Sequence, residues 1–126
     1  MREGSDALIV TTGITLKTGL DAANLLAQQG IEAAVVHVPT IKPLDTETLK
    51  RYCERTPVIV TVEEHTIIGG LGSALAELIA EAGFASPKRF CRIGIPDVFP
   101  DQYGSQASLM EHYNITAEHV AAVVRE

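Results

Sequence analysis

The chain is patterned as short apolar runs that alternate with segments of helical spacing. Apolar runs rich in β-branched residues cover residues 7–12, 33–38 and 57–62, and a less apolar run follows at 89–95. Continuous runs of this length are typical of strands that are buried on both faces of a sheet. The pattern therefore predicts four strands, with the last one nearer an edge of the sheet.

The first two helical segments lie between these runs. After Gly13, apolar residues recur at helical intervals as far as Gly30. A short second helix is expected after Asp45, which can cap its N-terminus, and this helix must end before Pro57. The apolar positions of the first helix are Leu16, Leu20, Ala23 and Ala27.

A third helix is expected from residue 71 until Gly83, followed by the fourth strand. A loop over 97–104 leads into a helix from Ser105 to Tyr113, which Asn114 terminates. Thr116 can cap a last helix. The inward-facing stripes consist of Leu71, Leu75, Leu78, Ile79 and Ala82 in the third helix and of Val120, Val123 and Val124 in the last.

This alternation of strands and helices predicts an α/β fold with three layers, α/β/α, around a mostly parallel sheet. With 126 residues, of which 46% are hydrophobic, the chain can form one compact domain over residues 1–126. The net charge of −6 argues against binding to nucleic acid or to anionic membranes. We find no signal peptide and no apolar run long enough to span a membrane, so a soluble, cytoplasmic protein is expected.

Two cysteines, Cys53 and Cys91, lie far apart and form no C-x-x-C motif. This spacing excludes zinc-ribbon and thioredoxin-like sites. Free thiols in a reducing compartment are expected, with each cysteine acting as a small core residue.

The stretch PVIVTVEEHTIIGGLGS, residues 57–73, joins a buried strand to a polar, glycine-rich turn. Ligands of open α/β sheets bind at the carboxyl ends of the strands. If the strands are parallel, that edge collects a polar set made of Thr11, Thr12, Gly13, His37, Thr40, Glu63, Glu64, His65 and Asp97.

Several kinds of functional site could be formed by these polar residues. The glycine turn could hold a phosphate at a helix N-terminus, but GGLG matches no nucleotide-binding motif and the adjacent carboxylates would repel an anion. A metal site formed by His37, Glu63, His65 and Asp97 has no recognised ligand spacing, and no G-x-S-x-G elbow is present. His65 beside Glu64 could serve in acid–base catalysis, although hydrogen bonding to a loop or a partner is the commoner use of such a pair.

The residues also carry a family resemblance over nearly the whole chain. Three segments resemble the C-terminal domain of the transketolase family. They are TVEEHTIIGGLGSALAELIAE at 61–81, the strand, helix, strand and IKPLD turn at 10–45, and the ending with Tyr103, Gly104 and NITAEHV. The likeness is greatest to stand-alone transketolase C-terminal sections and to deoxyxylulose-phosphate synthase.

The resemblance implies a five-stranded, mostly parallel sheet with one antiparallel strand, which we expect between Pro96 and Tyr103 or at an edge. It also implies that the complete enzyme uses thiamine diphosphate and Mg. The chain has no GDG followed by paired asparagines, and it lacks the glutamate-bearing domain that activates the cofactor. We therefore expect no cofactor, no metal and no catalytic residue on this chain alone, and no activity of the isolated chain.

The expected function is that of a C-terminal domain or split subunit of a transketolase-like transferase of carbohydrate metabolism, catalysing ketol transfer between sugar phosphates. Its partners would be the N-terminal and pyrimidine-binding domains, in a homo-dimer or larger assembly. The candidates for a substrate-proximal or domain-interface site are Glu63, Glu64, His65, Gly69, Gly70 and Gly72.

Two alternatives remain open. The chain could be a free-standing binding or regulatory module on the same fold, because a fold alone does not fix a function. It could also be the dimerisation domain of an oxo acid dehydrogenase beta subunit. The equivalent motif there typically lacks a histidine after the glutamates, so His65 weighs against this reading.

Overall fold

The computed structural model describes residues 2–38, 45–66, 71–84, 87–95 and 116–125, apart from the side chains of residues 14, 64–66 and 95. Strands and helices alternate along this part of the chain, as the apolar pattern predicts. The elements are β1 (Ala7–Thr11), the 3-10 helix η1 (Gly13–Thr15), α1 (Leu16–Ala27), β2 (Ala33–His37), α2 (Thr46–Arg55), β3 (Val58–Thr66), α3 (Leu71–Ala82), β4 (Arg89–Ile95) and α5 (Ala117–Arg125).

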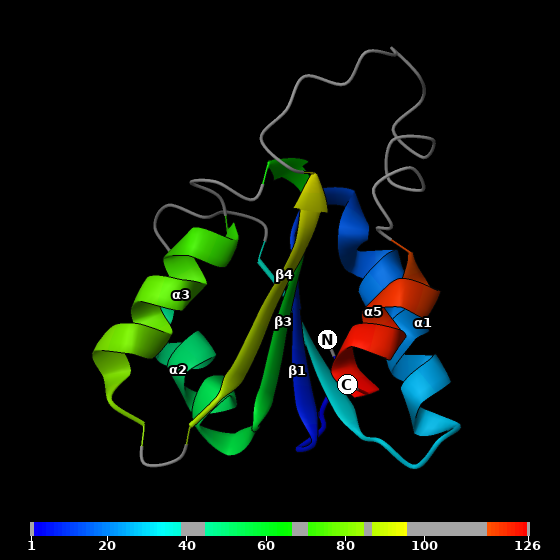
Figure 1. Cartoon of the computed structure of the whole chain (residues 1–126), viewed down its shortest axis with the longest axis horizontal. Coiled ribbons are helices and arrows are strands. Elements are labelled where there is room, and N and C mark those ends of the chain that lie inside the picture. Colours follow the sequence, from blue (N-terminus) through cyan, green and yellow to red (C-terminus); the bar gives the residue numbers. More distant parts are fainter. Residues whose placement is uncertain (1, 39–44, 67–70, 85–86, 96–115, 126) are drawn as a thin grey trace.

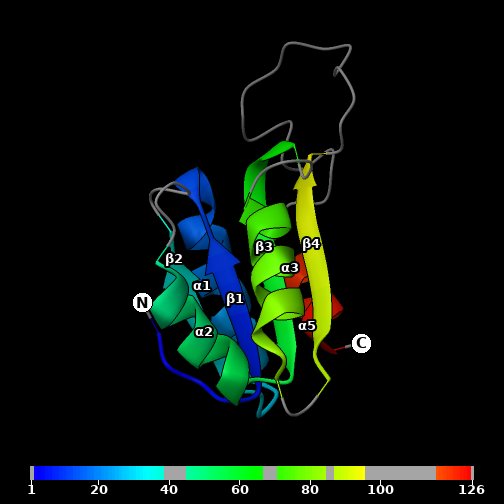
Figure 2. The same ribbon diagram turned by 90° about the vertical axis from the view of Figure 1, so that its left-hand side faces the viewer.

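The described strands form one parallel sheet in the order β2-β1-β3-β4. Helices α1 and α5 cover one face of this sheet, and α2 and α3 cover the other (Figure 1). Figure 2, which looks onto α2 and α3, shows α2 on the side of β1 and β2 and α3 in front of β3. The predicted three-layer α/β architecture is confirmed, and β4 lies at an edge of the sheet that the described strands form, as its composition predicts.

Alternate residues of each strand point into two separate halves of the core. On β1, Ile9 packs under α1 and α5, whereas Leu8 and Val10 pack under α2 and α3. All three side chains are fully buried. Because both faces of the strand are covered, β1 has no polar side before Thr11, which explains its continuous apolar run.

The described sheet has four strands, and its strand pairings are all parallel. Residues 96–103, one of the places where we expect the fifth strand, lie outside the described residues. Antiparallel pairing does occur at the β2 edge, as an isolated bridge between Arg2 and Val35. The Arg2 N–H donates to the Val35 carbonyl at 3.1 Å, and the Val35 N–H donates to the Arg2 carbonyl at 2.8 Å.

Local capping signals position two of the helices as predicted. The Asp45 side chain accepts the Thr48 N–H at 3.2 Å and the Thr48 hydroxyl at 2.8 Å, so Asp45 caps α2. The Thr116 hydroxyl accepts the His119 N–H at 3.2 Å at the start of α5. Gly83, with a positive φ of 62°, follows the end of α3. The expected helix over 105–113 and its end at Asn114 lie outside the described residues.

The apolar stripe of α3 is buried less completely than its pattern predicts. Leu71 and Leu75 are fully buried, whereas Leu78, Ile79 and Ala82 are only half-buried. Leu71 and Leu75 in the first two turns belong to the core, and Leu78 and Ile79 pack against it while part of their apolar surface stays accessible.

The two cysteines are free thiols, as expected. Cys53 is a fully buried residue of α2, and burial raises the pKa of its thiol from 9.0 to about 11. Cys91 is half-buried beside the core under α1 and α5. In the described part of the chain, no helix has both the length and the apolarity that a membrane span requires.

Candidate functional site

The parallel sheet brings the polar ends of neighbouring strands together. Thr11, the last residue of β1, lies opposite His37 on one side and Val62 on the other. The Thr11 hydroxyl and His37 Nδ1 are 3.0 Å apart, within hydrogen-bond distance. Two members of the predicted polar edge therefore contact each other across β1 and β2.

Thr15, which the sequence reasoning did not single out, joins the β1 edge to β3. Its buried hydroxyl lies 2.6 Å from the Thr12 carbonyl and 2.8 Å from the Val62 carbonyl, and it accepts the Thr12 N–H at 3.1 Å. The T-x-x-T spacing of residues 12–15 is a local capping signal, but the contact with Val62 depends on strand order. These bonds fix the turn after β1 against the strand that carries Glu63.

Glu63 is a buried carboxylate at the junction between β3 and α3. Its side chain comes from within β3, since the strand continues to Thr66, and the residue is only 1% exposed. One carboxylate oxygen accepts the Gly72 N–H at 2.6 Å, and the other accepts the Leu71 N–H at 3.0 Å. Glu63 thus binds the first two N–H groups of α3, where the helix dipole favours a negative charge.

Gly72 allows a close approach to this carboxylate. A Cβ atom at this position would lie 3.0 Å from Glu63 Oε1, 2.7 Å from Arg92 Cγ and nearer still to Arg92 Cδ. The Arg92 side chain therefore crosses over Gly72, and its Nη1 lies 3.4 Å from the Ser73 hydroxyl. Sequence reasoning missed Arg92 because its position beside α3 follows from the pairing of β4 with β3.

Two of the six candidates, Glu63 and Gly72, are brought into direct contact. Glu64 and His65 lie in the last part of β3, and their side chains are outside the described residues. Gly69 and Gly70 lie outside the described residues as well, as do Thr40 and Asp97 of the predicted polar edge.

The contacts of Glu63 argue against a phosphate site at the start of α3. A phosphate at the start of α3 would need the N–H groups of Leu71 and Gly72, which already bind the Glu63 carboxylate. Among the residues that the structure describes, no three His, Cys, Asp or Glu side chains are grouped so that they could hold a metal ion. This part of the chain therefore does not fit a diphosphate–magnesium site, and its chemistry is that of a rigid strand-to-helix junction.

Comparison with protein families gives the context of this junction. The family model described as "Transketolase, C-terminal domain" matches residues 1–120. The chain belongs to the transketolase C-terminal domain family. The resemblance carried by residues 10–45 and 61–81 is thereby confirmed.

Curated relatives of this transketolase C-terminal domain are longer than the chain. A 1-deoxy-D-xylulose-5-phosphate synthase of Heliobacterium modesticaldum is 46% identical over 126 residues, which is 100% of this chain and 19% of the relative. A putative transketolase C-terminal section of Methanocaldococcus jannaschii is 40% identical over 124 residues, or 98% of this chain and 37% of the relative. The chain thus spans between about a fifth and somewhat over a third of the length of these relatives.

Solved structures agree with the family assignment. A structure described as a split gene transketolase, an inactive beta4 tetramer, matches with a TM-score of 0.86 and 40% identity, covering 98% of this chain and 39% of that one. A transketolase from Pichia stipitis matches with a TM-score of 0.67 at 22% identity, over 99% of this chain and 16% of that one. The second likeness supports the fold alone.

Proposed function

We propose that this chain is the C-terminal domain, or a separately encoded part, of a thiamine-diphosphate-dependent transketolase-like enzyme that catalyses ketol transfer between sugar phosphates. It contributes domain packing and dimerisation and has no catalytic activity alone. The observation that carries the proposal is the match to a split gene transketolase over 98% of this chain but only 39% of that one. A domain that corresponds to a minor part of its relatives works together with the remainder.

The cofactor is assigned to that remainder. The described residues do not fit a diphosphate–magnesium site, because the N–H groups at the start of α3 bind Glu63 and no cluster of metal-ligating side chains is found there. Thiamine diphosphate would supply a carbon nucleophile in the complete enzyme, and groups outside this chain would orient it.

We propose a division of labour within the candidate site. Glu63 acts as a scaffold, since its buried carboxylate is engaged with backbone groups of α3. Glu64, His65 and the turn that contains Gly69 and Gly70 form the surface that faces an adjoining domain or the active-site entrance. Gly72 lets Arg92 and Glu63 approach the start of α3 closely.

A first experiment tests the dependence on a partner. The isolated chain is heated with and without thiamine diphosphate and Mg, and its turnover of ketose phosphates is measured. The melting temperature should stay unchanged and no turnover should be seen. A cofactor-dependent rise in melting temperature, or turnover by the isolated chain, would contradict the proposal.

A second experiment tests the surface around His65. In the complete enzyme, His65→Ala should raise the Michaelis constant for the sugar phosphate and leave the affinity for thiamine diphosphate unchanged. Removing a residue that contacts the substrate but not the cofactor changes the Michaelis constant and leaves the cofactor affinity as it was. An unaltered Michaelis constant would reduce His65 to a structural residue.

A further inference from the structure

Helix α3 carries more apolar surface than the described fold covers. Nearly all of its twelve residues, LGSALAELIAEA, are apolar or small. Beyond the buried first turns, Leu78 and Ile79 remain half-buried and Ala80 is exposed. A helix that is apolar on most sides is normally surrounded by other protein. The later turns of α3 are therefore suited to a contact beyond this chain.

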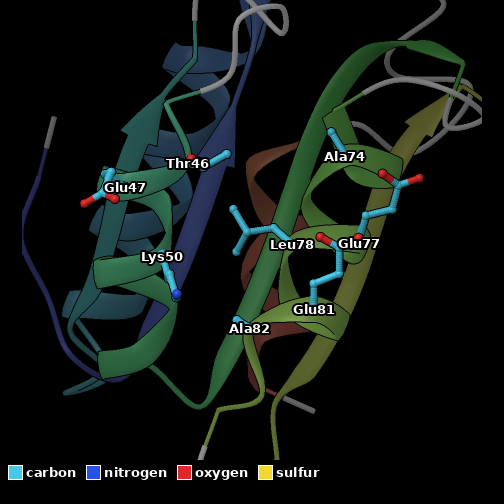
Figure 3. A pocket seen from close by; sticks show the side chains of 8 residues that line it. All are labelled: Thr46, Glu47, Lys50, Ala74, Glu77, Leu78, Glu81 and Ala82. Carbon is cyan, nitrogen blue, oxygen red and sulfur yellow. The ribbon is translucent and has the colours of Figure 1, made fainter.

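A groove of about 500 Å³ runs between these turns and α2. Figure 3 shows Leu78 extending from α3 toward α2, with Lys50 on the opposite side of the groove. Besides Lys50, the charged residues that line the groove are Glu47, Glu77 and Glu81, so carboxylates predominate. The groove thus combines an apolar element with an acidic rim.

The acidic rim has no partner among the described residues. Glu77 and Glu81 are exposed and lie one helical turn apart, and neither forms a hydrogen bond or salt bridge with any residue that the structure describes. Like charges at this spacing destabilise a helix by a few tenths of a kcal/mol. A positively charged partner would relieve this repulsion.

We propose that the groove between α2 and α3 receives an amphipathic helix from the remaining part of the same transketolase-like enzyme. That helix places apolar side chains against Leu78 and Lys or Arg side chains opposite Glu77 and Glu81. A helix suits the site because an amphipathic helix can lay its apolar face into an apolar groove. The proposal rests on the proposed function, since most of such an enzyme lies outside this chain.

The test is the affinity of this chain for the polypeptide that carries the thiamine-diphosphate and pyrimidine-binding domains, produced separately and measured by titration calorimetry. The double variant Glu77→Lys/Glu81→Lys should weaken binding about tenfold or more, because two attractive pairs become repulsive. The matched control is Glu32→Lys/Glu118→Lys, which makes the same change in net charge at exposed positions away from the groove. The control should bind within about twofold of the wild type. Circular dichroism verifies that both variants are folded.

A weakened groove variant beside an unaffected control supports the proposal. If the wild type and the groove variant bind equally well, the groove is not the docking site, and the proposed function stands without it. If both variants weaken binding to the same extent, overall charge accounts for the effect and the groove proposal is wrong. A wild-type chain that does not bind the polypeptide contradicts both the groove and the proposed function.

Discussion

Replacing Glu63 with glutamine should destabilise the junction between β3 and α3. The substitution keeps the size of the side chain but removes the charge and replaces one acceptor oxygen with an NH₂ group. In the wild type, both oxygens accept backbone N–H groups of α3, at 2.6 and 3.0 Å. The glutamine can accept only one of these two N–H groups, and its NH₂ group faces the other N–H group, which then has no acceptor.

The magnitude follows from the burial of this carboxylate, which is 1% exposed. A hydrogen bond to a charged group contributes about 1.5–3 kcal/mol, and a neutral one contributes about 1 kcal/mol. A buried donor left without an acceptor costs about 1–3 kcal/mol more, while the lower desolvation cost of a neutral amide offsets part of the loss. We expect a net decrease of about 2 kcal/mol in the free energy of unfolding.

Urea unfolding at neutral pH is the assay, and the midpoint should fall by about 1 M for a loss of this size. Hydrogen exchange should show faster exchange of the Leu71 and Gly72 amides in the variant. Glu118→Gln, at an exposed position in the first turn of α5, is the control and should leave the midpoint nearly unchanged. A Glu63→Gln midpoint equal to that of the wild type would show that the carboxylate does not hold the start of α3.

Two further predictions concern contacts elsewhere in the fold, at the end of α5 and within α2. Arg89→Leu removes the guanidinium that donates to the carbonyls of Val123 and Val124, both at 2.7 Å, so urea unfolding should show a loss of about 1–3 kcal/mol; an unchanged midpoint would contradict a capping role at the end of α5. For Cys53, burial raises the pKa of the thiol from 9.0 to about 11. The folded chain therefore holds this proton at a pH where the unfolded chain releases it, and the stabilisation that is present below pH 9 is lost as the pH rises toward 11. The stability difference between wild type and Cys53→Ala should shrink over this interval, and a constant difference would contradict the burial effect.

The order of elements was predictable from the sequence because both faces of the sheet are covered. Residues 7–10 and 33–36 form continuous apolar runs for that reason, and the helix between them shows helical spacing. Capping was also readable locally, since Asp45 and Thr116 each bind an N–H group three residues later.

The role of Glu63 could not be read from the sequence in the same way. Its bonds reach eight and nine residues along the chain, and they depend on where α3 begins. From sequence alone, a carboxylate beside a glycine turn indicates only that an anion would be repelled there. The structure shows that the carboxylate itself takes the place of an anion at the start of the helix.

Arg92 and Thr15 escaped prediction because their partners follow from strand order. Arg92 pairs in register with Thr61 of β3, which brings it beside the start of α3. Thr15 contacts the Val62 carbonyl, 47 residues further along the chain. The burial of α3 was overestimated for a related reason, because helical periodicity identifies an apolar face without identifying what covers it.

The central claim, that this chain completes a transketolase-like enzyme, is tested most directly by reconstitution. The chain is mixed with the separately produced polypeptide that carries the thiamine-diphosphate and pyrimidine-binding domains, and turnover of ketose phosphates is measured with thiamine diphosphate and Mg. We predict that turnover requires both polypeptides and saturates as this chain is added. Full turnover by the other polypeptide without this chain, or no turnover by the mixture, would contradict the claim.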